Sequence, residues 1–241
     1  MSRKKLHNCA IFIMKGIKMR IKKNLSQKKK KDVKKAPYGA ATIEMILDAA
    51  CAVFSRCPYE AASIRMIAAE GGFYHSLIRH HFPSKASIFE ALSKEGCDEL
   101  RVANKSWLTE MAGLGPRAAL SLYLDRYIAY YASHPETFHI IAQNMPREDA
   151  QSIPGYDHLA NLLAGIREDF EKANILLLDR ETSLRFLESL NGLLNHYLGS
   201  GATEARLLGF EPNSPDYLKW VKETVMFIFL PVLEKSLNMR S

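Results

Sequence analysis

Residues that interrupt helices are scarce in this chain. Among its 241 residues there are only 10 prolines and 13 glycines, and no long stretch alternates apolar with polar side chains. Strict alternation marks a half-buried strand, whereas apolar residues at intervals of three and four mark a helix. The lack of the first pattern argues against an extended sheet and predicts an all-α protein.

The chain is also poor in cysteine and in long apolar runs. Its four cysteines (Cys9, Cys51, Cys57 and Cys97) show neither C-x-x-C spacing nor the density of a disulfide scaffold, so we expect free thiols in a reducing compartment. The longest apolar run, residues 225–233, contains Pro231 and is far shorter than the ~20 residues of a membrane-spanning helix. Residues 9–14 are too short for the apolar region of a signal peptide.

Acidic residues are nearly missing from the first 35 positions, where Asp32 stands against 14 lysines and arginines. This segment carries +13, and because the whole chain has a formal net charge of +7, the remainder carries −6. A basic arm ahead of a folded domain is typical of contact with nucleic acid or another anionic surface. The alternative is a solvated extension that precedes a native start at Met14 or Met19, and the sequence leaves both interpretations open.

A helix-turn-helix pattern follows this basic segment. Helical intervals predict three short helices, at 41–54, 64–70 and 74–81. Pro58 ends the first helix, Ser63 is suited to cap the second, Gly72 ends it, and Ser84 caps a long helix that follows the third. A tight glycine turn between the second and third helices is the outline of a helix-turn-helix, although the spacing alone also fits three unrelated helices.

The residue identities decide between these alternatives. They read I-L-D-A-A at 46–50, V-F at 53–54, S-I-R-M-I-A at 63–68, Gly72, and L-I-R-H-H-F-P-S-K at 77–85. In this order and spacing they resemble the DNA-binding signature of the TetR family of bacterial transcriptional regulators. The resemblance implies a three-helix DNA-binding domain followed by a larger helical domain for effector binding and dimerisation. It also implies a homodimeric repressor that leaves a palindromic operator when a small ligand binds.

The resemblance further implies which residues meet DNA. The third helix enters the major groove with its first turn at the base edges, and flanking groups contact phosphates. That first turn is Tyr74, His75 and Ser76, and the helix N-terminus capped by Ser63 faces a phosphate. The predicted DNA-binding residues are Ser63, Tyr74, His75, Ser76, Leu77, Arg79, His80 and Lys85.

Four positions depart from the family pattern. Tyr74, His75 and Leu77 replace the small, polar and threonine residues that are usual there, which leaves the operator sequence open. Pro58 stands where glycine is usual, and because proline cannot adopt a positive φ, we expect a different turn and a small adjustment of the first helix.

Five further helices are predicted, at about 120–132, 136–143, 156–172, 180–198 and 215–237, with a glycine-rich loop before the last. The last two are apolar on every side, which predicts burial on more than one side. They are buried either within the monomer or, as the resemblance implies, in a dimer. The predicted interface residues are Leu187, Leu190, Leu194 and Phe227.

An aromatic cluster lies on the first two of these helices. Aromatic rings with a few polar tips suit the lining of a small-molecule pocket, although aromatic residues at helical spacing are also common in plain core. The predicted ligand-binding residues are Tyr127, Tyr130, Tyr131, His134, Phe138 and His139.

The sequence therefore predicts a basic tail at 1–37, a helix-turn-helix domain at 38–86, and an effector-binding and dimerisation domain at 87–241. The expected partners are a double-stranded DNA operator, a second copy of the chain and a small apolar or amphipathic effector. No cofactor, metal or membrane is expected. A bacterial cytoplasmic, nucleoid-associated location follows from the same interpretation.

The sequence supports three other functions less well. Glu136-x-x-His139 is half of a di-iron carboxylate motif, but the second half is missing, and His80 and His81 point to different helix faces, so we expect no enzyme. A metal- or redox-sensing regulator using histidines or the cysteines is weakly supported. A helical small-molecule or lipid carrier with a vestigial helix-turn-helix remains the main alternative, since Tyr74 is unusual.

Overall fold

The computed structural model describes residues 39–173, 176 and 178–238, and every regular element within those ranges is a helix. The all-α prediction is thereby confirmed. The predicted basic tail, with Cys9, lies outside the described residues. From Thr42 onward the chain forms one compact unit. No helix in the part of the chain described here has the length and apolar content needed to span a membrane.

The N-terminal helices form where the sequence predicted them. They are α2 (Ala40–Phe54), the 3-10 turn η1 (Tyr59–Ala61), α3 (Ile64–Gly71) and α4 (His75–His81). Ser63 Oγ accepts a hydrogen bond from the Met66 N–H at 3.2 Å, which is an N-cap. Gly72 ends α3 with φ +69°, a left-handed conformation that glycine adopts without strain. Pro58, where a different turn was expected, has extended backbone and leads into η1.

Helix α5 (Lys85–Met111) joins two hydrophobic cores. It begins with a capping box in which Ser84 and Ser87 bond reciprocally. Its first turns place Ile88 and Phe89 in the core of the helix-turn-helix, where the Phe89 ring meets that of Phe54 edge-on at 4.8 Å. The boundary expected between residues 86 and 87 thus falls inside one continuous helix.

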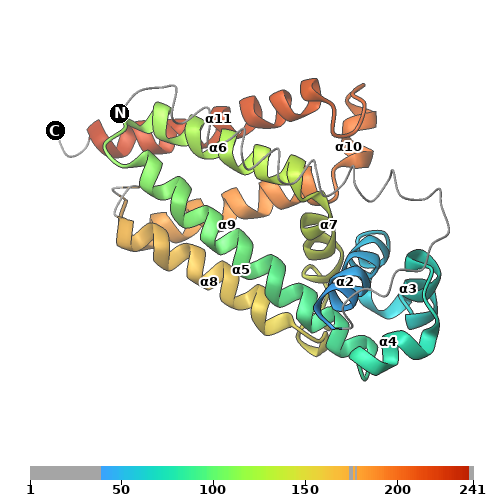
Figure 1. The fold of residues 1–241 in the computed structure, drawn as a ribbon. Coiled ribbons are helices and arrows are strands. Elements are labelled where there is room, and N and C mark those ends of the chain that lie inside the picture. The colour runs from blue at the N-terminus through green and yellow to red at the C-terminus, as the bar shows by residue number, and fades with distance from the viewer. Residues whose placement is uncertain (1–38, 174–175, 177, 239–241) are drawn as a thin grey trace, which may run out of the picture. The chain divides into compact units, whose positions relative to one another are not determined.

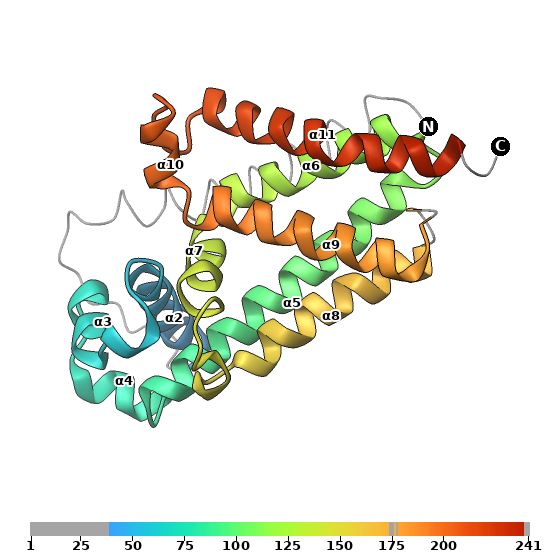
Figure 2. The same cartoon turned by 180° about the vertical axis from the view of Figure 1, so that it is seen from behind.

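The C-terminal helices pack around the remainder of α5. They are α6 (Pro116–Ser133), α7 (Pro135–Asn144), η2 (Ala150–Ser152), α8 (Tyr156–Ala173), α9 (Arg180–Leu194), the π-helical turn η3 (Asn195–Gly199), α10 (Ala202–Leu207) and α11 (Pro215–Asn238). Helix α5 lies along α8 and α6 (Figure 1), and α11 packs on α6 and α9 (Figure 2).

Two predicted boundaries in this part were wrong. The helix expected to run to residue 198 leaves α geometry after Leu194 and continues as η3. The expected glycine-rich loop contains helix α10, which is held by Ala205, a fully buried residue. Its apolar contact stabilises a helix too short to be stable alone.

Candidate DNA interface and ligand cavities

The outer face of α4 is polar and basic. Ser76, Arg79 and His80 are exposed at intervals of three and four, which places them on one helix face, whereas Ile78 is fully buried beneath them. His75 and Leu77 are partly buried. The exposed side of α4 is therefore accessible to a DNA groove, while the opposite side anchors the helix to the core.

Tyr74 is the most prominent side chain at the start of α4. It occupies the N-cap position without capping the helix through its side chain, and it is 85% exposed. Its carbonyl accepts the Leu77 N–H at 2.9 Å. A large ring held out at a helix N-terminus can contact a base edge or a phosphate.

Arg65 is a further exposed cation, on helix α3, which packs against α4, although the sequence analysis did not single it out. It is exposed in the first turn of α3, two residues after Ser63, and it forms no ion pair or hydrogen bond with any described residue. By contrast, Glu70 is paired with Arg56, and Glu60 with Arg147. Arg65 and Arg79 are thus left as available cations. The exposed position within the S-I-R motif was the signal that could have identified Arg65.

Lys85, which was predicted to lie toward the DNA backbone, makes contacts within the protein. Its ammonium donates to the carbonyl oxygens of Tyr59 at 2.7 Å and Ala62 at 3.0 Å, and it lies 4.1 Å from the centroid of the Tyr59 ring. These contacts satisfy carbonyls at the end of η1 and direct the charge inward. Lys85 therefore ties α5 to the turn before α3.

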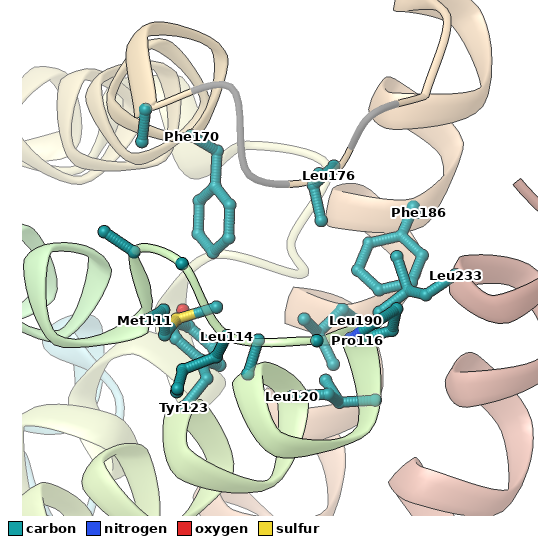
Figure 3. A pocket seen from close by; sticks show the side chains of 15 residues that line it. Met111, Leu114, Pro116, Leu120, Tyr123, Phe170, Leu176, Phe186, Leu190 and Leu233 are labelled. Atoms are coloured by element: carbon teal, nitrogen blue, oxygen red, sulfur yellow. The ribbon is translucent and has the colours of Figure 1, made fainter. Parts of the chain in front are cut away.

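A cavity lies at the C-terminal end of α5, between α5, α6, α8 and α9, and we call it the end cavity. It encloses about 470 Å³, within the range of small-molecule sites. Phe170 of α8 points toward it from one side, and Phe186 and Leu190 of α9 line another (Figure 3). Every side chain lining it is apolar except the hydroxyl-bearing Tyr123.

A smaller cavity, of about 170 Å³, lies against α7, and we call it the α7 cavity. Two predicted ligand-binding residues, Tyr127 and Phe138, line it. Burial raises the pKa of Tyr127 well above its usual range, so its phenol is neutral. The other four predicted residues line neither cavity: Tyr130, Tyr131, His134 and His139.

The four residues outside the cavities have contacts of their own. The Tyr130 ring stacks on His134 at 4.4 Å, and the Tyr131 hydroxyl bonds to Asn213. Burial lowers the pKa of His139, an effect that nearby Glu136 partly opposes. Helical spacing grouped these residues with Tyr127, but their side chains make other contacts, including that of Tyr130 with Trp107 of α5.

Helix α7 holds the helix-turn-helix on its other face. Asn144, 1% exposed, accepts the Tyr59 N–H at 3.0 Å and donates to the Ile140 carbonyl at 2.8 Å. Gln143 donates to the Ser55 carbonyl at 2.7 Å. Ile140 is buried in the same core as α2 and α3. The α7 cavity and the DNA-binding domain are therefore separated by a single helix.

Residues 46–92 match the family model described as bacterial regulatory proteins, tetR family. The match covers the capped α3, the glycine turn and α4 with its exposed basic face. The helix-turn-helix is of the tetR family. No curated protein sequence matches the chain.

Solved structures of transcriptional regulators share the fold of most of this chain. A regulator from Streptomyces coelicolor is 17% identical with a TM-score of 0.56, covering 83% of this chain and 90% of that one. A TetR regulator from Legionella pneumophila is 22% identical with a TM-score of 0.55, covering 80% and 100%. FadR from Bacillus subtilis, in complex with stearoyl-CoA, is 15% identical with a TM-score of 0.55, covering 79% and 96%. The chain thus has the tetR-type fold, with the larger helical domain that was predicted.

Within this tetR-type fold, three of the four predicted dimer residues are not available to a partner. Leu187, Leu190 and Leu194 are at most 2% exposed in the single chain, because α9 packs them inward against the core that includes α11. Phe227 is different, since it is 83% exposed. The outward apolar residues of these two helices are Leu184, Phe227, Ile228 and Val232.

The structure also shows the surroundings of the residues considered for metal or redox chemistry. Within the described ranges no group of three or more histidines, cysteines, aspartates or glutamates is placed to hold a metal ion. Burial, with smaller contributions from nearby acids, raises the pKa of the Cys51 thiol to about 12. Cys57 Sγ lies 3.5 Å from the Val53 carbonyl. A thiol whose pKa is raised by burial has low reactivity, so Cys51 has the environment of a packing residue.

Proposed function

We propose that this protein is a ligand-responsive transcriptional repressor that binds a palindromic operator as a homodimer. The observation that carries the proposal is the tetR-type helix-turn-helix with an exposed, unpaired basic face, joined by α5 and α7 to a domain that contains cavities. Each part has a separate physical basis.

DNA contact is assigned to the exposed side chains around α3 and α4. Tyr74, His75 and Ser76 start α4 and are placed to read base edges, with Leu77 behind them. Arg65, Arg79 and His80 contact phosphates, together with the N-terminus of α3 capped by Ser63. No acidic residue occurs between Gly71 and Phe89, so this surface attracts the DNA backbone.

The dimer is assigned to the outward faces of α9 and α11. An exposed phenylalanine beside further exposed apolar residues is a surface that association would remove from water. A two-fold symmetric pair presents two α4 helices to two half-sites of a palindrome. The central contact is Phe227 in place of the buried leucines of α9.

The effector is assigned to the helical domain, residues 87–241 of the predicted division. The walls of the end cavity are apolar apart from the Tyr123 hydroxyl, and those of the α7 cavity are mainly apolar but include Glu188, Asn191 and Asn195. The ligand therefore has a mainly hydrocarbon body. The fold likeness to FadR, whose structure contains stearoyl-CoA, supports the same ligand class. Such a ligand releases DNA only if it binds the DNA-incompetent arrangement more tightly.

Fluorescence anisotropy with the DNA upstream of the protein's own gene, in competition with random duplex at two salt concentrations, tests the proposal. We expect saturable binding that prefers the upstream fragment and is lost in the Arg79→Ala, His75→Ala double variant. Equal affinity for both duplexes would refute it and favour the helical carrier with a vestigial helix-turn-helix, which the two cavities would then serve.

A further inference from the structure

The two cavities lie at successive levels of the same helical bundle. Helix α5 contributes Met111 to the end cavity and Leu100 to the α7 cavity. Helix α8 likewise contributes Phe170 to the end cavity and Ile166 to the α7 cavity. Helices α6 and α9 also line both cavities. The cavities are therefore neighbours along one column rather than separate pockets on different faces.

Tyr123, which lines the end cavity, and Asn104, which lines neither cavity, lie between the two levels along α6 and α5, and we call this pair the partition. Asn104 lies between Met111 and Leu100 on α5, and the Tyr123 hydroxyl donates to Asn104 Oδ1 at 3.1 Å. The Tyr123 ring packs edge-on against Phe170 with centroids 5.4 Å apart. Both partition residues are at most 1% exposed.

The partition is incompletely satisfied. Asn104 Nδ2 is buried and has no hydrogen-bond partner among the described residues. An amide donor without an acceptor in an apolar interior is costly. Tyr123 is held by its one hydrogen bond to Asn104 and by ring contacts with Trp107, Tyr127 and Phe170, and displacing it breaks these contacts.

We propose that the effector is a straight-chain aliphatic molecule whose length is read at this partition. This inference rests on the proposed function and names its ligand. A short chain fills the end cavity, with its polar head at the opening. A longer chain displaces Tyr123 and enters the α7 cavity, where it presses on Phe138, Ile141 and Met145. Phe138 and Ile141 lie on α7, and Met145 directly follows it. Gln143 and Asn144 of the same helix hold the helix-turn-helix.

Helix geometry sets the length at which the response begins. At about 1.5 Å per residue, Asn104 lies about 10 Å and Leu100 about 16 Å from Met111 along α5. An extended hydrocarbon advances about 1.3 Å per carbon, from C–C bonds of about 1.5 Å in zig-zag. About eight carbons therefore reach the partition, and about thirteen reach the level of Leu100.

The test compares octanoate with tetradecanoate on the full chain, with calorimetry for binding and anisotropy for DNA release. Both fatty acids bind, and affinity rises about fourfold for each methylene buried. Tetradecanoate weakens operator binding about tenfold or more, whereas octanoate leaves it nearly unchanged. Equal release by both acids, or binding of neither, would overturn the inference.

Leu163→Trp, at a half-buried position lining the α7 cavity, supplies the decisive variant. It should weaken tetradecanoate about tenfold and leave octanoate unchanged. Val102→Trp, at a position 70% exposed on α5, is the matched control and should change neither. Equal weakening of both acids by Leu163→Trp contradicts the partition.

Tyr123→Phe keeps the ring and removes its bond to Asn104, so it should tighten tetradecanoate binding alone. This variant tests the partition if Leu163→Trp fails to fold. Because calorimetry needs no DNA, the length dependence is measurable even if the protein binds no operator. That pattern without DNA binding would refute the proposed function and leave the cavity assignment standing.

Discussion

Lys85 Nζ lies 2.7 Å from the carbonyl oxygen of Tyr59, 26 residues earlier in the chain. The bond joins the start of α5 to the turn between α2 and α3, and a second bond to Ala62 reinforces it. Lys85, whose place in the sequence motif predicted a position toward the DNA backbone, thus fixes the orientation of the helix-turn-helix on α5.

Replacing Lys85 with methionine should destabilise the protein without changing the number of contacts that the protein makes with DNA phosphates. Loss of charged hydrogen bonds costs about 1–3 kcal/mol, measurable by urea unfolding. The slope of log affinity for DNA against log salt should stay the same, because a phosphate contact would lower it by about one. Lys94→Met, which removes only an exposed pair with Asp98, is the control and should change stability by less than about 0.5 kcal/mol. A reduced salt slope in Lys85→Met would show that the lysine meets DNA after all.

Arg65→Ala should weaken specific and random DNA binding alike. A phosphate contact carries no sequence information, so the ratio of the two affinities should remain constant while the salt slope falls by about one. Arg206→Ala, on exposed α10, provides the matched loss of charge. If both variants behaved identically, Arg65 would have no place in the interface.

Phe227→Glu should convert a dimer into a folded monomer. The side chain is 83% exposed in the single chain, so the substitution leaves the core intact and places a charge in the apolar contact. Light scattering after size exclusion reports the mass, and circular dichroism the fold. Leu207→Glu, at a residue 81% exposed on α10, should remain dimeric. The opposite pattern would move the interface to α10.

Asn144→Leu should loosen the attachment of the helix-turn-helix to α7. The Tyr59 N–H loses its acceptor, which costs about 1–3 kcal/mol of unfolding free energy, and its hydrogen exchange should accelerate. Gln143→Leu frees only a carbonyl of Ser55, so the loss should be smaller. Unfolding midpoints and amide exchange rates measure the loss of stability in each variant. A larger loss in Gln143→Leu than in Asn144→Leu would contradict this account.

His139 should make the protein less stable in mild acid. Burial holds its pKa below the ordinary value, which is about 6.5 in an unfolded chain. The unfolded state therefore binds the proton more readily, and stability falls as the pH drops through 6.5 toward the lower folded-state pKa. Urea midpoints between pH 7.5 and 5.5 should decline less in His139→Gln than in the parent. An equal decline would assign the acid sensitivity to other groups.

The sequence by itself determined the local elements of this protein. Ser63 and Ser84 cap helices because a hydroxyl reaches an N–H two or three residues ahead, and Gly72 ends α3 because its own backbone tolerates positive φ. Such interactions join residues that are close in the sequence, so the helix-turn-helix motif could also be predicted from the sequence.

Only the tertiary structure decided what each side chain faces. Helical spacing placed Leu187 on an apolar face but could not say whether a partner or α11 covers it, and it grouped Tyr127 with Tyr130 although only Tyr127 lines a cavity. Lys85 points inward because its acceptors are brought there by residues far away in the chain. Burial, cavities and long-range hydrogen bonds depend on which helices meet, and no local pattern contains that information.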